Sequence, residues 1–172
     1  MGTDGSIHAA SYIVTTLKKF NVKPLGKSYS SSFVHENLLG ESYGQNVVGV
    51  IYGTVQPEQF IVLSAHYDHI GKKGRAIYNG TDDNASGVSA LLSMAERISN
   101  EPLKHSVIFL FTDGEEINLL GAKAFFNNYP EVTQRIKLNV NLDMISGHRS
   151  TKSLRYIQWP KKQDFKIANK YE

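Results

Sequence analysis

The chain has 172 residues, of which 41% are hydrophobic, and it contains no cysteine. This length and composition suit one domain with a sizeable core. The lack of cysteine excludes disulfides, thiolate catalysis and cysteine-ligated structural zinc. Basic residues outnumber acidic ones by 19 to 16, but the surplus lies in the segment 149–172, and the rest of the chain is slightly acidic. The overall basicity therefore does not indicate nucleic acid as a partner.

No stretch of the sequence approaches the about 20 apolar residues of a membrane-spanning helix. The first residues, MGTDGSIHAAS, lack the basic and apolar regions of a signal peptide. A protein whose signal has been removed begins in the same way. The basic segment 149–172 is typical of a solvated surface tail of uncertain structure, and an acidic partner is the less favoured alternative.

The first elements are predicted from apolar spacing and from breaker residues. Segment 6–20 has apolar residues at helical spacing, and the sequence NVKPLG at 21–26 ends that helix. The polar, serine-rich segment 28–38 is typical of an edge strand or a loop. Runs of β-branched residues at 46–52 and 60–64, separated by a turn, predict two strands with hairpin-like spacing.

After residue 60, predicted strands and helices alternate. Helical patterns at 85–99 and 119–128 flank the continuous apolar run at 106–111, which is expected of a strand covered on both faces. Further strands are predicted at 136–142 and, more weakly marked, at 154–159. The alternation predicts a single α/β domain over 1–172. We expect three layers, α/β/α, around a mixed, largely parallel sheet.

Histidine or acidic residues follow the apolar runs in four segments. These are AHYDH at 65–69, NGTDDNASG at 79–87, FTDGEE at 111–116 and NLDM at 141–144. Open α/β folds bind ligands at the edge where such strands end. Imidazole and carboxylates without cysteine match the ligands of a hydrolytic zinc site.

In the first two segments each motif has a functional and a structural interpretation. His66 and Asp68 would point to the same side of an extended chain, so the carboxylate can accept the ring's distal N–H and fix its tautomer for a metal. The same letters occur by chance in exposed loops, and His69 beside them is given no role. Asp82 and Asp83 open a helix, where one acidic residue is explained by capping. Two are more than a cap needs, and a carboxylate held there can bridge two cations about 3.5–4 Å apart.

The last two segments carry three more carboxylates. Side chains adjacent on a helical turn diverge by about 100°, so one of Glu115 and Glu116 can bind a metal while the other acts as a general base. Two solvated glutamates at a helix start are the alternative. Asp143 follows a mainly apolar strand and is desolvated unless it is paired or metal-bound, or else it is an exposed strand end. The coincidence of four such clusters in one chain favours a site.

In this order, H-Y-D-H, G-x-D-D-N-A-S-G, D-G-E-E followed by L-L-G, and N-L-D-M resemble the family of dinuclear zinc aminopeptidases. That family also includes glutamate carboxypeptidases and the transferrin receptor ectodomain. The resemblance covers residues 7–145. It implies four ligands for two Zn²⁺ ions: His66 and Asp143 on one ion, Glu116 on the other, and Asp83 bridging both.

The resemblance also implies the roles of two further carboxylates. Glu115 is similar to the family's general base, and Asp68 to the residue that orients His66. The peptide bond after Asp83 is often cis in this family.

One part of the family pattern has no counterpart here. The family supplies a last histidine to the second zinc from well beyond the N-L-D-M strand, whereas this sequence ends at Glu172 and its later histidine, His148, follows Asp143 too closely. We therefore expect the C-terminal portion of the domain to be missing, rearranged or supplied by another chain. The second ion is then expected at low occupancy, with two carboxylates and no imidazole.

The activity implied by the resemblance is that of a zinc-dependent exopeptidase, an aminopeptidase acting on peptides. Most relatives act outside the cytoplasm, which favours a secreted or periplasmic protein. One alternative is a catalytically impaired fragment or a peptidase-like binding module. Another is a single-zinc enzyme of the glutaminyl cyclase type, which His66 and the Glu115–Glu116 pair disfavour. Neither the side-chain preference nor the oligomeric state follows from the sequence.

Overall fold

A computed structural model of the chain describes residues 1–37 and 40–146. Within them, six strands form one sheet in the order β1-β3-β7-β4-β8, with β2 also paired to β3. Their bounds are β1 Lys23–Pro24, β2 Ser30–Asn37, β3 Gly40–Ile51, β4 Gln56–His66, β7 His105–Thr112 and β8 Ile136–Asn141. A separate two-stranded hairpin, β5 Gly71–Lys73 and β6 Ala76–Tyr78, follows β4.

The sheet is mixed, as predicted, but within the described residues it is not largely parallel, because three of its five strand pairings are antiparallel. β4 pairs in parallel with β7 and with β8, whereas β3 pairs antiparallel with β1, β2 and β7. The register aligns His66 with Thr112 and Ser64 with Asn141. The carboxyl ends of the three parallel strands therefore reach the same edge of the sheet, which brings the chain segments after them together.

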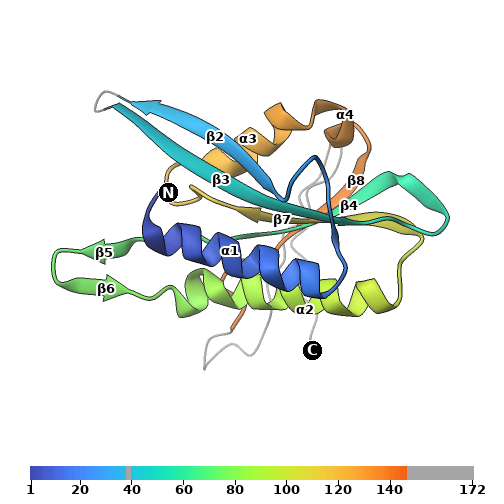
Figure 1. Cartoon of the computed structure of the whole chain (residues 1–172), viewed down its shortest axis with the longest axis horizontal. Coiled ribbons are helices and arrows are strands. Elements are labelled where there is room, and N and C mark those ends of the chain that lie inside the picture. Colours follow the sequence, from blue (N-terminus) through green and yellow to red (C-terminus); the bar gives the residue numbers. More distant parts are fainter. Residues whose placement is uncertain (38–39, 147–172) are drawn as a thin grey trace, which may run out of the picture.

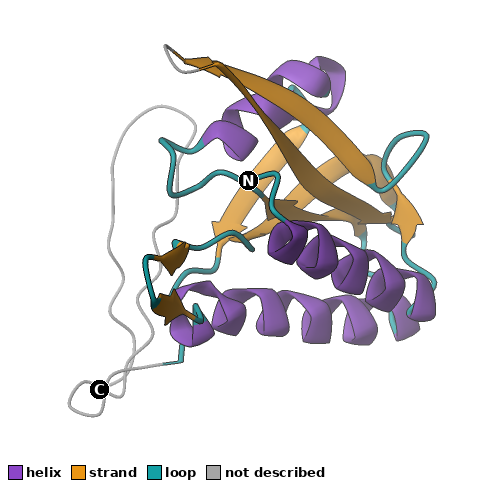
Figure 2. Ribbon diagram, turned by 60° about the vertical axis from the view of Figure 1, so that its left-hand side comes forward, coloured by secondary structure: helices purple, strands orange, loops and turns teal. Residues whose placement is uncertain are grey.

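Helices cover both faces of the sheet, which confirms the three-layer α/β/α prediction. The helices α1 Asp4–Lys19 and α2 Gly87–Asn100 lie side by side on one face, and α3 Leu120–Asn128 and α4 Pro130–Thr133 lie on the other (Figures 1 and 2).

The central strand β7 explains how the two faces are filled. Phe109 packs in the hydrophobic cluster under α1 and α2, and its neighbours Ile108 and Leu110 pack in the cluster under α3. Successive strand residues point to opposite faces, so a continuous apolar run serves both layers. Each fully buried side chain of this kind contributes about 1.5–3 kcal/mol through burial.

The predicted helices and strands within the described residues are present with shifted ends. α1 begins at Asp4, before the first apolar residue, because Thr3 and Ser6 form a reciprocal capping box with N–H to side-chain distances of 3.1 and 3.2 Å. The short elements β1, β5, β6 and α4 were not predicted. The candidate strand at 154–159 and the basic tail at 149–172 lie outside the described residues. Among the helices of the described part, none has the length and apolar character needed to cross a membrane.

Candidate metal centre

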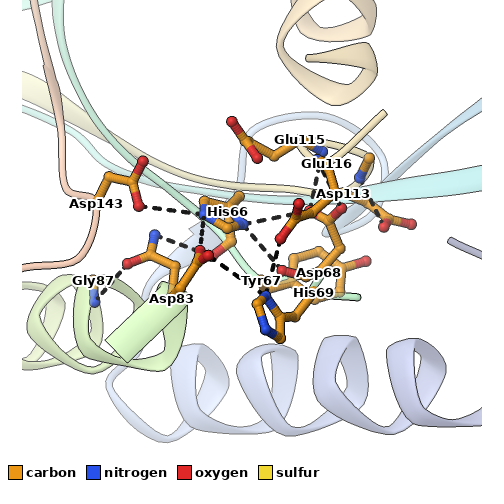
Figure 3. Close-up of polar contacts among 12 residues, drawn as sticks. His66, Tyr67, Asp68, His69, Asp83, Gly87, Asp113, Glu115, Glu116 and Asp143 are labelled. Carbon is orange, nitrogen blue, oxygen red and sulfur yellow. Dashed lines mark hydrogen bonds and ion pairs between the residues drawn. The ribbon is translucent and has the colours of Figure 1, made fainter. Parts of the chain in front are cut away.

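The four sequence motifs meet at the edge of the sheet where the parallel strands end (Figure 3). β4 ends at His66, β7 leads into the turn with Glu115 and Glu116, and β8 leads to Asp143. Asp83 comes from the irregular turn Thr81–Ser86 that precedes α2. The strand order places these segments next to one another although they are distant in the chain.

His66 faces two carboxylates through one ring nitrogen. Its Nε2 lies 3.2 Å from Asp83 Oδ1 and 3.4 Å from Asp143 Oδ1. Ligand atoms of a tetrahedral zinc with bonds of about 2.0–2.1 Å lie about 3.3 Å apart, so both separations from Nε2 match such a site, and all three ligand atoms lie within 4.8 Å of one another. The ring is 3% exposed, whereas the carboxylates are 36% and 44% exposed, so the cluster opens to solvent on the carboxylate side.

The hydrogen bond of the other ring nitrogen determines the tautomer of His66. His66 Nδ1 lies 3.0 Å from the main-chain carbonyl of Asp68 and donates its proton to that oxygen. A neutral ring then presents the bare lone pair of Nε2 to two carboxylates, an arrangement that needs a proton or a cation between them. Burial lowers the pKa of His66, but its interactions with Asp68 and the charge of Asp143 outweigh burial and raise that pKa from 6.5 to about 9. The donor set therefore fits a cation such as zinc.

The carboxylate of Asp68 has a different partner from the one expected from sequence. Asp68 Oδ1 lies 3.7 Å from His66 Nδ1, which is beyond hydrogen-bond length. Its two oxygens instead accept the main-chain N–H groups of Glu115, at 3.1 Å, and Glu116, at 3.4 Å. Burial opposes the ionised form, but His66 and these two N–H groups hold the pKa of Asp68 below its ordinary value. Asp68 thus orients His66 through its carbonyl and holds the glutamate turn through its carboxylate.

The two glutamates are directed to different places. Glu115 extends toward the cluster of His66 and Asp143 (Figure 3). Burial, together with the charges of Asp143, Glu116 and Asp68, raises the pKa of Glu115 above its ordinary 4.5, although His66 opposes this shift. Such a shift moves a carboxylate toward the range of a general base.

Glu116 belongs to a second cluster that sequence reasoning missed. Its Oε1 lies 3.0 Å from His69 Nδ1, and that nitrogen lies 3.7 Å from Asp83 Oδ2. An imidazole therefore lies beside Glu116, whereas the sequence led us to expect two carboxylates alone at this position. The sequence feature that could have indicated this cluster is the pair His66 and His69 in H-Y-D-H, at the end of a buried strand. His148, considered from the sequence, lies outside the described residues.

The comparisons with known proteins agree with this arrangement. Residues 46–169 match the model of Peptidase family M28. The chain belongs to this family. Because the match includes all four motifs, it confirms the resemblance inferred from the sequence.

The sequence identities between this chain and individual relatives are low. The chain is 28% identical over 115 residues to aminopeptidase YwaD of Bacillus subtilis, a match that covers 66% of the chain and 24% of that protein. A Zn-dependent exopeptidase from Parabacteroides distasonis shares the fold with a TM-score of 0.69 and 22% identity, over 87% of this chain and 57% of that one. A glutaminyl cyclase from an Acidobacteriales bacterium matches with a TM-score of 0.72 and 21% identity, over 84% and 52%. The M28 chain thus spans between a quarter and just over half of the length of these relatives.

The sequence of the M28 chain also did not reveal the structural role of Asn84. It is 2% exposed, and its Nδ2 donates to the carbonyl of Leu142 at 2.9 Å. Its Oδ1 accepts the N–H groups of Gly87 and Met144, both at 3.1 Å. Asn84 therefore joins the start of α2 to the end of β8, on either side of Asp143. The peptide bond between Asp83 and Asn84 is cis, as the resemblance implied.

Proposed function

We propose that the chain carries the catalytic centre of a zinc-dependent exopeptidase that removes N-terminal residues from peptides. The observation that carries the proposal is the buried His66 nitrogen facing Asp83 and Asp143, with Glu115 directed toward the same place. Membership in a peptidase family supports zinc and peptide hydrolysis. The printed name of the B. subtilis relative supports an aminopeptidase.

His66, Asp83 and Asp143 would hold one zinc ion. Such an ion polarises a substrate carbonyl and lowers the pKa of a water molecule. Asp68 keeps the ring proton of His66 on Nδ1, so that Nε2 remains free for the metal. Glu115 acts as the general base that takes a proton from the attacking water and passes it to the leaving amine.

A second ion completes the proposal. Asp83 directs Oδ1 to the His66 cluster and Oδ2 to the side of Glu116, which suits a carboxylate that bridges two cations about 3.5–4 Å apart. Glu116 is then a ligand of that second ion. By resemblance, we expect the protein to act in a secreted or periplasmic setting.

The substitution Glu115→Gln tests the general base. Hydrolysis of aminoacyl anilides by the zinc-loaded chain should fall about 10²–10⁴-fold, because the amide cannot take the proton. Zinc content, measured by elemental analysis, should stay that of the wild-type chain. Glu131→Gln, at an exposed position of α4, is the matched control and should change neither quantity. Undiminished hydrolysis in Glu115→Gln would remove Glu115 from the mechanism.

Two alternatives are separated by the products of the same assay. The fold shared with glutaminyl cyclases makes cyclisation of N-terminal glutamine the second candidate. That reaction releases ammonia and leaves the peptide bond intact, whereas an aminopeptidase releases a free amino acid. Tight zinc binding with neither product would instead favour a peptidase-like binding module.

A further inference from the structure

One buried asparagine joins the two ends of the loop that carries the two glutamates. This loop lies between β7 and α3, and Asn46 reaches it from the neighbouring strand β3. Asn46 is completely buried. Its Oδ1 accepts the main-chain N–H of Asp113 at 3.1 Å, and its Nδ2 donates to the carbonyl of Gly121 at 2.7 Å. A single amide therefore closes residues 113–121 into a ring.

The start of α3 is shaped for this contact. A Cβ atom at Gly121 would lie 2.4 Å from Asn46 Oδ1 and 2.3 Å from the carbonyl oxygen of Asp113. Only a residue without a side chain lets the first turn of α3 approach the end of β7 this closely. The span between the two ends of the loop is therefore fixed by Gly121 and Asn46 together.

The loop needs such contacts because its main chain is strained. Asn118 and Leu119 have φ angles of +63° and +59°, although neither is glycine. Residues with side chains keep such angles only where the surrounding structure holds them. The N–H of Leu119 donates to the carbonyl of Glu115 at 3.1 Å, so the strained pair is bonded directly to that glutamate. Loss of the Asn46 contacts would let the pair relax and would move Glu115.

We propose that Asn46 is a positioning residue for the general base. Asp68 holds the N–H of Glu115, and Asn46 holds the ends of the loop from which this side chain extends toward the His66 cluster. The inference rests on the proposed function, which makes Glu115 the base. In the competing role, Asn46 only stabilises the fold by pairing two main-chain groups, as buried polar side chains commonly do.

Ser106 provides a matched control. It is completely buried, its Oγ accepts the N–H of Gly53 at 3.0 Å, and the same hydroxyl donates to the carbonyl of Pro57 at 2.6 Å. It pairs one main-chain donor and one main-chain acceptor, as Asn46 does, but it lies at the opposite end of β7 from the site. Asn46→Ala and Ser106→Ala should both lower the free energy of unfolding, because each leaves buried polar groups without a partner.

Amide hydrogen exchange of the metal-free chain separates the two roles. In Asn46→Ala, the N–H groups of Glu115 and Leu119 should exchange about tenfold faster or more, relative to those of the central strand β4, which report global unfolding. In Ser106→Ala this ratio should stay that of the wild-type chain. Asn46→Ser, whose hydroxyl can serve only one of the two groups, should show a smaller increase. It carries the test if Asn46→Ala does not fold.

Hydrolysis of aminoacyl anilides by the zinc-loaded chain tests the link to the base. Asn46→Ala should lower kcat about 100-fold, the cost of a displacement of about 1 Å. KM and zinc content should stay near those of the wild-type chain, because the three proposed ligands of the first ion lie outside the loop. Ser106→Ala should keep the wild-type kcat.

Two results would overturn the inference and leave the proposed function intact. In one, the loop amides exchange no faster relative to β4 in Asn46→Ala than in Ser106→Ala, so that Asn46 is only structural. In the other, exchange in the loop rises but kcat is unchanged, so that Glu115 does not depend on Asn46. If the wild-type chain hydrolyses no anilide, or Glu115→Gln hydrolyses it equally fast, the proposed function fails. The assignment of Asn46 to a base then fails with it, whatever the exchange rates.

Discussion

His66 uses its two ring nitrogens for different purposes. Nδ1 is committed to the carbonyl of Asp68, and Nε2 is directed at two carboxylates. In the metal-free chain the raised pKa of about 9 means that Nε2 also carries a proton at neutral pH. Zinc requires the unprotonated nitrogen, so metal and proton compete for one atom.

Zinc affinity should therefore depend on pH with a definite sign. Below about pH 9 the ion that His66 binds displaces one proton from this ring, so affinity at that site should rise about tenfold per pH unit between about pH 7 and pH 9 and then cease to rise from this cause. Competition with a chromophoric chelator measures the slope. Calorimetry in buffers of different ionisation enthalpy should show release of about one proton near pH 7. An affinity constant over this range would contradict the raised pKa.

The single residues show what a sequence can and cannot reveal. His66 and Asp143 were found because each comes at the end of an apolar run, and strand ends converge in an α/β fold. Asp83 was found as a second acidic residue at a predicted helix start, and it lies in the turn before α2 and not at a strand end. The partner of Asp68 was not found, because residues two apart in a strand share a side, but the chain leaves the strand after His66. His69 was missed because only the folded loop brings it to Glu116.

At the level of elements, the junction of α2 with β8 sets the distance between Asp83 and Asp143. Gly87 begins α2, and a Cβ atom there would lie 2.5 Å from both the carbonyl of Leu142 and Asn84 Oδ1. Neither atom can move freely, because one is main chain and the other accepts two N–H groups.

Gly87→Ala should consequently push α2 away from β8. We expect a loss of about 1–3 kcal/mol in the free energy of unfolding, the usual cost of overpacking, together with weaker zinc binding. Urea unfolding and calorimetric titration measure the two effects. Gly5→Ala is the control: it lies in the first turn of α1, where the nearest atom to a new Cβ is 3.9 Å away. This variant should be neutral or slightly more stable. If Gly87→Ala is as stable as the wild-type chain, α2 can move away from β8 without a cost in free energy, which would contradict this prediction.

The elements were predictable where periodicity was long. α2 carries enough apolar residues to define a helical period, and β7 is an unbroken apolar run of strand length; the predicted cores of both are present. β1 and β5 span two and three residues, too few for any pattern, and they exist because a neighbouring strand offers hydrogen-bond partners. The turn Thr81–Ser86 combines a cis bond with non-helical angles at Asp83 and Asn84, so helical spacing could not describe it.

On the scale of the whole molecule, the sheet brings together segments that the chain keeps apart. His66, Glu116 and Asp143 lie at or after the ends of three different strands, and both hydrophobic clusters contribute residues of these strands to the core. Without a cation, the same edge gathers several carboxylates at close range, which costs free energy through repulsion. Metal binding and global stability are therefore coupled.

Zinc should raise the melting temperature of the chain. A ligand that binds only the folded state at about 100 times its dissociation constant adds about 2.7 kcal/mol, which corresponds to a rise of about 5–10 °C for a domain of this size. Differential scanning calorimetry of metal-loaded and chelator-treated chain measures the difference. Glu115→Gln should keep the rise, because its metal ligands are unchanged, and His66→Ala should lose most of it. An equal melting temperature with and without bound zinc would mean that the ion also binds the unfolded chain, and that the convergence of the strand ends adds nothing to its affinity.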